Sequence, residues 1–242
     1  MDYNGIFFYK PFCLVVSPQI KMTSPKVLVL GHSFVRRLEQ FVRDSTKPWI
    51  NRRFNLNYPI ETYFHGIGGR TVDGVLEHDV SEIQRYKPNI VIIEIGCNDL
   101  SDPRCSPYDL VSKINQLICV IRRVATDCFI IVSEILPRNN IPFRTPNYNR
   151  KVQEANYQLH RFCSQCSSVL FWSHGNLSER TPWVLKPDGV HLNSIGNRKL
   201  YISYQRALLR VFSTYNVRAV NSTVSVFHRH RARRRNPACQ KL

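Results

Sequence analysis

The chain has 242 residues, 43% of them hydrophobic, and its 34 lysine and arginine residues outnumber its 17 acidic residues, which gives a formal net charge of +17. This composition suits one α/β domain with terminal extensions, and the lack of an apolar run of about 18 residues argues against a membrane-spanning helix. The apolar N-terminal run Ile6–Val16 is interrupted by Lys10 and Pro11, so it resembles a signal peptide poorly. With eight cysteines in no regular disulfide spacing, an intracellular, cytoplasmic location is expected.

Short apolar runs that are rich in β-branched residues recur along the chain. The run Ile90–Ile95 is the strongest of them, because nearly continuous apolar composition is typical of a central strand covered on both faces. Strands are expected at Val27–Leu30, near Glu61–Phe64, and at Ile90–Ile95, Phe129–Val132 and Val169–Trp172.

Longer segments with apolar residues at helical spacing follow each strand. Helices are expected at Phe34–Asp44, Thr71–Tyr86, Pro107–Ala125, Asn147–Cys166 and Ser194–Phe212. Such alternation predicts a parallel sheet with right-handed crossovers. The expected fold class is therefore α/β, a three-layer α/β/α sandwich around a flavodoxin-like parallel sheet of about five strands, with ligands beyond the carboxyl ends of the strands.

Both ends of the chain fall outside this alternation. Met22 offers a second start just before the first strand, so residues 1–25 are expected to be an N-terminal extension and residues 26–213 the domain. No acidic residue follows Asp188, and the densest basic cluster is His228–Arg235. Residues 214–242 are predicted to be a disordered basic tail, which binds nucleic acid or an anionic surface in one interpretation and is merely solvated in the other.

Two short elements with catalytic potential follow the first two strands. In Gly31-His32-Ser33-Phe34 a serine stands at a strand-to-helix turn, where the helix N-terminus favours developing negative charge, although serine is also a common helix cap. In Gly66-Ile67-Gly68-Gly69 the glycines allow backbone amides to point into a concavity and stabilise an oxyanion, although an ordinary turn has the same composition.

Two further elements complete the pattern. Gly96-Cys97-Asn98-Asp99 follows the third strand, and its asparagine amide either donates to an oxyanion or caps a turn. Asp188-Gly189-Val190-His191 precedes the last helix, and a carboxylate three residues before a histidine either holds the imidazole for serine activation or belongs to a surface turn. Each element is weak singly, but all four in order at one sheet edge favour a catalytic site over separate turns and caps.

These four blocks resemble the SGNH hydrolases, also called the GDSL esterase/lipase family. The matching residues are Gly31-His32-Ser33, Gly69, Gly96-Cys97-Asn98-Asp99 and Asp188-Gly189-Val190-His191. The Gly66–Gly69 and Ile135–Arg138 stretches also resemble the platelet-activating-factor acetylhydrolase α-subunit branch. The similarity covers roughly Lys26 to Phe212.

The resemblance implies the SGNH hydrolase fold and a role for each matching residue. Ser33 would be the nucleophile, His191 the general base and acid, and Asp188 the residue that orients His191. The Ser33 and Gly69 backbone amides and the Asn98 side chain would form the oxyanion hole, with no metal and no cofactor. The implied reaction is hydrolysis of a carboxylic ester, a short acyl or acetyl ester, through an acyl-serine intermediate.

The sequence departs from the family pattern at His32, where the family usually has aspartate. The change is expected to alter the Ser33 turn, the local charge and the pH profile without excluding catalysis. Val35 occupies the place of the second glycine of a G-x-S-x-G elbow, so the standard α/β-hydrolase motif is absent. Cys97 is interpreted as a small space-filling side chain beside the active-site edge.

Other features allow weaker hypotheses. The pair Cys163 and Cys166, with His160 nearby, lacks a second ligand pair, so a zinc site is not expected. Tryptophans 49, 172 and 183 either line an acyl pocket or pack in the core and loops, and Trp183 is the best pocket candidate because its loop leads to Asp188.

A competing hypothesis retains the predicted fold but not ester hydrolysis as the main function. Esterase-like domains of this family also occur in open reading frames of some retroelements, and the basic tail and upstream extension suit such an origin. In that interpretation the chain is a nucleic-acid-associated module whose esterase activity is secondary or lost. The intact set of Ser33, Gly69, Asn98, Asp188 and His191 favours the enzyme.

Overall fold

The computed structural model describes residues 24–139, 145–177 and 182–214. The basic tail and nearly all of the N-terminal extension lie outside these residues, so the domain boundaries and the disorder of the ends stay predictions. Within the described ranges, no helix is long and apolar enough to cross a membrane.

A five-stranded parallel sheet forms the centre of the molecule, in the order β2-β1-β3-β4-β5. This is the flavodoxin-like strand order, so the predicted fold class is confirmed. The central strand β3 is buried along its whole length, as its nearly continuous apolar composition predicts. The strands are β1 (Lys26–Gly31), β2 (Glu61–Gly66), β3 (Ile90–Glu94), β4 (Phe129–Ser133) and β5 (Val169–Trp172).

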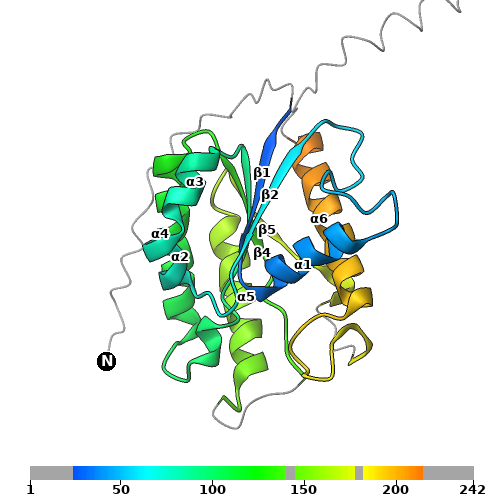
Figure 1. Ribbon diagram of the computed structural model, residues 1–242. Helices are drawn as coiled ribbons and strands as arrows, with labels where there is room; N and C mark the ends of the chain where they lie inside the picture. The colour runs from blue at the N-terminus through cyan, green and yellow to red at the C-terminus, as the bar shows by residue number, and fades with distance from the viewer. Residues whose placement is uncertain (1–23, 140–144, 178–181, 215–242) are drawn as a thin grey trace, which may run out of the picture.

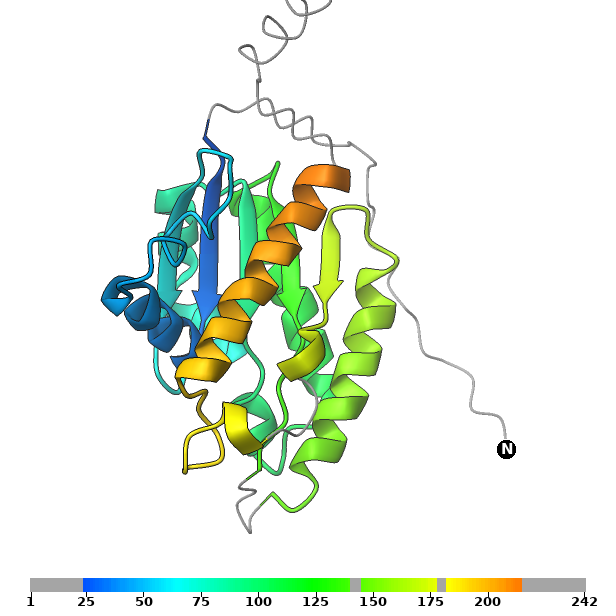
Figure 2. The same ribbon diagram turned by 90° about the vertical axis from the view of Figure 1, so that its right-hand side faces the viewer.

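Helices cover both faces of the sheet (Figures 1 and 2). Because side chains alternate along a strand, Val27 and Val29 join the core under α1 and α6, whereas Leu28 and Leu30 join the core on the opposite face. One face carries α1 (Ser33–Asp44) and α6 (Ser194–Thr214); the other carries α2 (Val72–His78), α3 (Val80–Tyr86), α4 (Pro107–Val124) and α5 (Tyr148–Cys163).

The single helix predicted over Thr71–Tyr86 is wrong, because the chain breaks there into α2 and α3 at Asp79. Asp79 is only 3% exposed, and its carboxylate pairs with Arg70 and His65. A buried carboxylate needs such partners, so the break places Asp79 where two residues of the β2 end reach it. The helical spacing of apolar residues continues through the break, so the sequence pattern does not reveal it.

All five strands end at the same edge of the sheet, where the loop before α6 also lies (Figure 2). The carboxyl ends of β1, β2 and β3 lead directly into the serine, glycine and asparagine blocks. The topology therefore gathers the predicted blocks at one edge.

Candidate active site

The nucleophile candidate Ser33 is the first residue of α1, two residues past the end of β1. Strands β1 and β3 approach so closely here that a Cβ on Gly31 would lie 2.0 Å from the Glu94 carbonyl oxygen. The His32 N–H donates to that same carbonyl across 3.2 Å. A side chain at position 31 would therefore displace the turn that presents Ser33.

His32 caps α1 with its imidazole instead of a carboxylate. Its Nδ1 accepts a hydrogen bond from the Phe34 N–H at 3.3 Å, so in the neutral ring the hydrogen lies on Nε2. That Nε2 faces the Cys97 sulfur at 3.1 Å. Burial lowers the pKa of His32 to about 4, with Arg138 and His191 adding to the effect and Glu94 opposing it.

Cys97 is buried in the apolar core, as the space-filling interpretation predicts, and it also makes a polar contact. Its sulfur is the partner of the His32 Nε2–H, and burial raises the pKa of the thiol to about 12, which keeps it protonated. The thiol in turn approaches the Asn98 side-chain oxygen at 3.9 Å. A chain of polar contacts therefore joins the Ser33 turn to the asparagine block.

The glycine and asparagine blocks are bound to each other. Asn98 Nδ2 donates to the Arg70 carbonyl at 2.9 Å, and Asp99 Oδ1 accepts from the Val72 N–H at 3.0 Å. An amide has two N–H groups, so the Asn98 side chain keeps a second donor. Gly69 has φ +74° and open space around its missing Cβ, as expected for a backbone that approaches a ligand closely.

Arg138 is hydrogen-bonded to the asparagine block. Its guanidinium donates to the Cys97 carbonyl at 3.1 Å and to Ser101 Oγ at 2.7 Å, and it lies 4.5 Å from the ring centroid of Tyr148. The sequence predicts no role for this arginine, and its only signal is its place at the end of the Ile135–Arg138 stretch.

Asp188 and His191 form a directly bonded pair in the loop before α6. Asp188 Oδ2 lies 2.8 Å from His191 Nδ1, and its Oδ1 accepts the backbone N–H groups of Val190 and His191. Partial burial opposes ionisation, but these hydrogen bonds outweigh it and lower the pKa of Asp188 to about 2. The aspartate therefore stays ionised and leaves His191 Nε2 for another partner.

The histidine ring lies on the Ser33 side of the edge. Its centroid is 6.3 Å from that of Phe34, the residue next to Ser33. No hydrogen bond joins Ser33 Oγ to His191 within the described ranges. The structure thus brings Asp188 into contact with His191 and places their loop against the start of α1.

The other candidates lie apart from these blocks. Trp183 is 52% exposed beneath the Lys199 ammonium, whereas Trp49 and Trp172 pack against the core, as the packing alternative predicts. Cys163 and Cys166 are buried, and the described residues hold no group of three or more side chains that could bind a metal ion.

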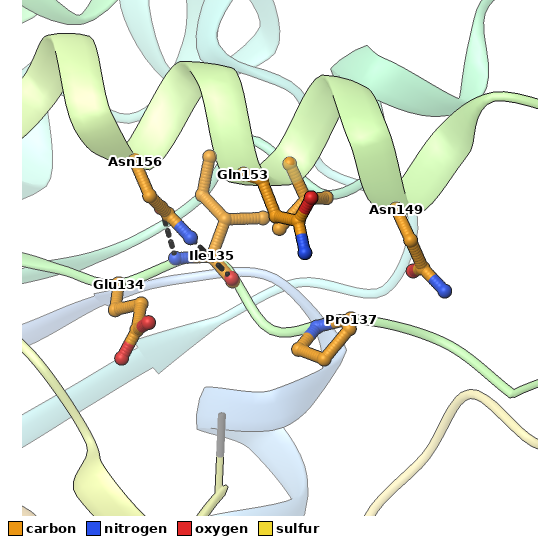
Figure 3. A pocket seen from close by; sticks show the side chains of 7 residues that line it. Glu134, Ile135, Pro137, Asn149, Gln153 and Asn156 are labelled. Atoms are coloured by element: carbon orange, nitrogen blue, oxygen red, sulfur yellow. Dashed lines mark hydrogen bonds between the residues drawn. The ribbon is translucent and has the colours of Figure 1, made fainter. Parts of the chain in front are cut away.

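A hollow of about 120 Å³ opens beside the carboxyl end of β4 (Figure 3). Asn156 on α5 hydrogen-bonds both the N–H and the carbonyl of Ile135 on one wall. None of the five predicted site residues lines it. The lining residues are Glu134, Ile135, Pro137, Asn149, Val152, Gln153 and Asn156.

The fold and the four blocks define a hydrolase of the SGNH class. The model of the GDSL-like lipase/acylhydrolase family matches residues 29–199, which is most of the chain. The chain belongs to this family and is an SGNH-type esterase.

Solved structures with the same fold include several hydrolases. A GDSL-like lipase from Bacteroides thetaiotaomicron has a TM-score of 0.61 and 16% identity, and the match covers 77% of this chain and 89% of that one. A Streptococcus pneumonia protein named for platelet activating factor has a TM-score of 0.57 and 19% identity, over 79% of this chain and 87% of that one. An acetylxylan esterase from Geobacillus stearothermophilus has a TM-score of 0.56 and 16% identity, over 77% and 95%. No curated protein sequence matches the chain.

Proposed function

We propose that this protein hydrolyses short acyl esters, acetyl esters among them, through an acyl-serine intermediate on Ser33. The observation that carries the proposal is the 2.8 Å contact of Asp188 with His191 Nδ1 in a loop that packs against the start of α1. This contact holds the imidazole in the tautomer whose Nε2 accepts a proton.

In the proposed reaction, His191 Nε2 takes the hydroxyl proton as Ser33 Oγ attacks the ester carbonyl. Negative charge on the carbonyl oxygen is met by the backbone N–H groups of Ser33 and Gly69 and by the remaining Asn98 N–H. His191 then gives the proton to the leaving alcohol. A water molecule, deprotonated by the same imidazole, attacks the acyl-serine, and the imidazolium returns the proton to Ser33 Oγ as the acid leaves.

The acyl preference draws on the likeness to known esterases. One structure of the same fold is an acetylxylan esterase. The tryptophan nearest to the Asp188 loop is exposed rather than enclosed in an apolar pocket. Both observations support a short acyl chain over a long one.

Labelling with a fluorophosphonate tests the nucleophile directly. The wild-type protein should be labelled and Ser33→Ala should not, because the probe needs an activated serine. Ser33 makes no side-chain hydrogen bond within the described ranges, so the variant should fold, as its melting temperature will show. Ser45→Ala, at the other end of α1, is the matched control and should label normally. Labelling of Ser33→Ala at another serine would overturn the assignment.

The nucleic-acid module is not proposed as a second function. None of the comparisons favours it, and the basic cluster on which it rests lies outside the described residues. The affinity of the tail stays a separate prediction.

A further inference from the structure

Two arginines follow the nucleophile candidate on the open side of α1. The helix buries Phe34, Val35, Leu38 and Val42 against the sheet. Residues three and four positions apart share one side of a helix, so Arg36 and Arg37 lie on the same exposed side as Ser33. Long side chains on a helix lean toward its N-terminus, which here is the catalytic edge. Arg37 is half-buried, whereas Arg36 is exposed.

Arg36 lies on the glycine-block side of Ser33. A Cβ on Gly66 would be 2.2 Å from the Arg36 backbone nitrogen, so α1 and the end of β2 are in close contact here. A Cβ on Gly68 would lie 3.4 Å from Arg36 Nη2 and 3.6 Å from its Cζ. The guanidinium therefore lies over Gly68, next to Gly69, whose open surface belongs to the proposed oxyanion hole.

Arg37 lies on the other side of Ser33. Each helical residue adds about 100° of rotation, so Arg37 is turned toward the side where Phe34 meets the ring of His191. Its Nε is buried and has no hydrogen-bond partner. A buried N–H without a hydrogen-bond partner destabilises the folded protein. An anionic ligand that accepts a hydrogen bond from it would remove this destabilisation.

Neither guanidinium has a carboxylate partner within the described residues, unlike three arginines near them. On the same helix Arg43 pairs with Asp44, and in the following loop Arg52 pairs with Glu39. Arg70, on the far side of the glycine block, pairs with Asp79. Two unpaired guanidinium groups thus lie on either side of Ser33, and guanidinium groups bind carboxylates and phosphates through paired N–H donors.

We propose that Arg36 and Arg37 form an anion-recognition pair, so that the natural substrate is an ester bearing a carboxylate or phosphate group near the reacting carbonyl. The inference rests on the proposed function of Ser33 and adds the substrate class to it. The pair binds a group that does not react, so it lowers KM more than it raises kcat.

Three esters test the proposal on the full-length protein: 4-nitrophenyl acetate, 4-nitrophenyl hemisuccinate and 4-acetoxyphenyl phosphate. The second carries its charge on the acyl side and the third on the alcohol side. At least one anionic ester should have a higher kcat/KM than the acetate. Arg36→Gln and Arg37→Gln should each lower the ratio of kcat/KM, anionic ester over acetate, by about 10-fold, the usual worth of a hydrogen bond to a charged group.

Arg43→Gln is the matched control, because it removes the same charge from the same helix at a position that is paired with Asp44. Its ratio should equal that of the wild type, and the melting temperatures of all three variants will show whether each is folded. Equal ratios in all three variants, or preference for acetate over both anionic esters, would overturn the anion-recognition pair while leaving the esterase in place. Failure to hydrolyse any ester, together with absent labelling at Ser33, would overturn the proposed function itself.

Discussion

The catalytic edge has two halves that are held in different ways. The serine, glycine and asparagine blocks are fixed by buried contacts with β3, with Arg138 and with one another. The Asp188–His191 loop is fixed mainly by hydrogen bonds within itself, and the two side chains are 45% and 25% exposed. Substitutions in the first half should therefore change stability and activity together, whereas those in the second half should change activity much more than stability.

Asp188→Asn is the sharpest test of the exposed half. The amide oxygen still accepts the two backbone N–H groups, so the loop should keep its shape, but an amide no longer stabilises the imidazolium or fixes its tautomer. By analogy with the aspartate of the serine-protease triad, kcat should fall by about 10⁴-fold. The melting temperature should fall only slightly, because the carboxylate that the folded protein stabilises is largely exposed. A large loss of stability with full activity would reverse the comparison.

Asn98→Ala tests the buried half. The variant loses the proposed oxyanion donor, and kcat should fall by about 10²–10³-fold while KM changes little. It also loses the bond to the Arg70 carbonyl, so the melting temperature should fall as well. Steady-state kinetics and thermal unfolding of one preparation measure both effects. An unchanged kcat would show that Asn98 only ties two loops together.

Much of the fold was predictable, because burial leaves a direct pattern in the sequence. The run Ile90–Ile93 is apolar throughout and makes up most of the central strand. The break at Asp79 was not predictable, because the partners of its carboxylate lie outside the helical segment, His65 in β2 and Arg70 in the loop that follows it. Local periodicity carries no information about such a contact.

The candidate site also has a part that the sequence predicts and a part that it does not. The carboxyl ends of parallel strands meet at one edge, so the gathering of the blocks could be expected from their order alone. The contact between His32 and Cys97 could not, since 65 positions separate the two residues in the sequence. The departure at His32 signalled that something differs at this turn, but only the structure shows a cap that uses a neutral imidazole.

The neutral His32 cap predicts that the folded protein loses stability in acid. The pKa of His32 is about 4 in the folded protein against an ordinary value of 6.5, because burial disfavours the charged ring. Between these values the unfolded chain binds a proton that the folded chain does not, so the free energy of unfolding falls as pH drops. The loss should approach roughly 3 kcal/mol near pH 4.

The measurement is urea unfolding of the wild type and His32→Asn from about pH 7 down to about pH 4.5. Asparagine is a good helix cap that does not titrate, so the variant should show the shallower pH dependence. His78→Asn, at an exposed histidine, should keep the wild-type slope. Equal slopes for His32→Asn and the wild type would show that another group carries the acid sensitivity.

The smallest expected effect on catalysis comes from the basic tail, because all four blocks lie upstream of it. Truncation after Thr214, where α6 ends, should leave kcat on a small neutral ester unchanged. If the tail binds nucleic acid, the full-length protein should bind with little sequence preference and with an affinity that falls steeply with salt, since phosphate contacts release counterions. Replacing arginines 229, 231, 233, 234 and 235 with glutamine should remove that affinity as completely as truncation does. Equal binding by the full-length and truncated proteins at low and physiological salt would place the interaction on the domain, where the basic residues of α1 and α6 are the next candidates.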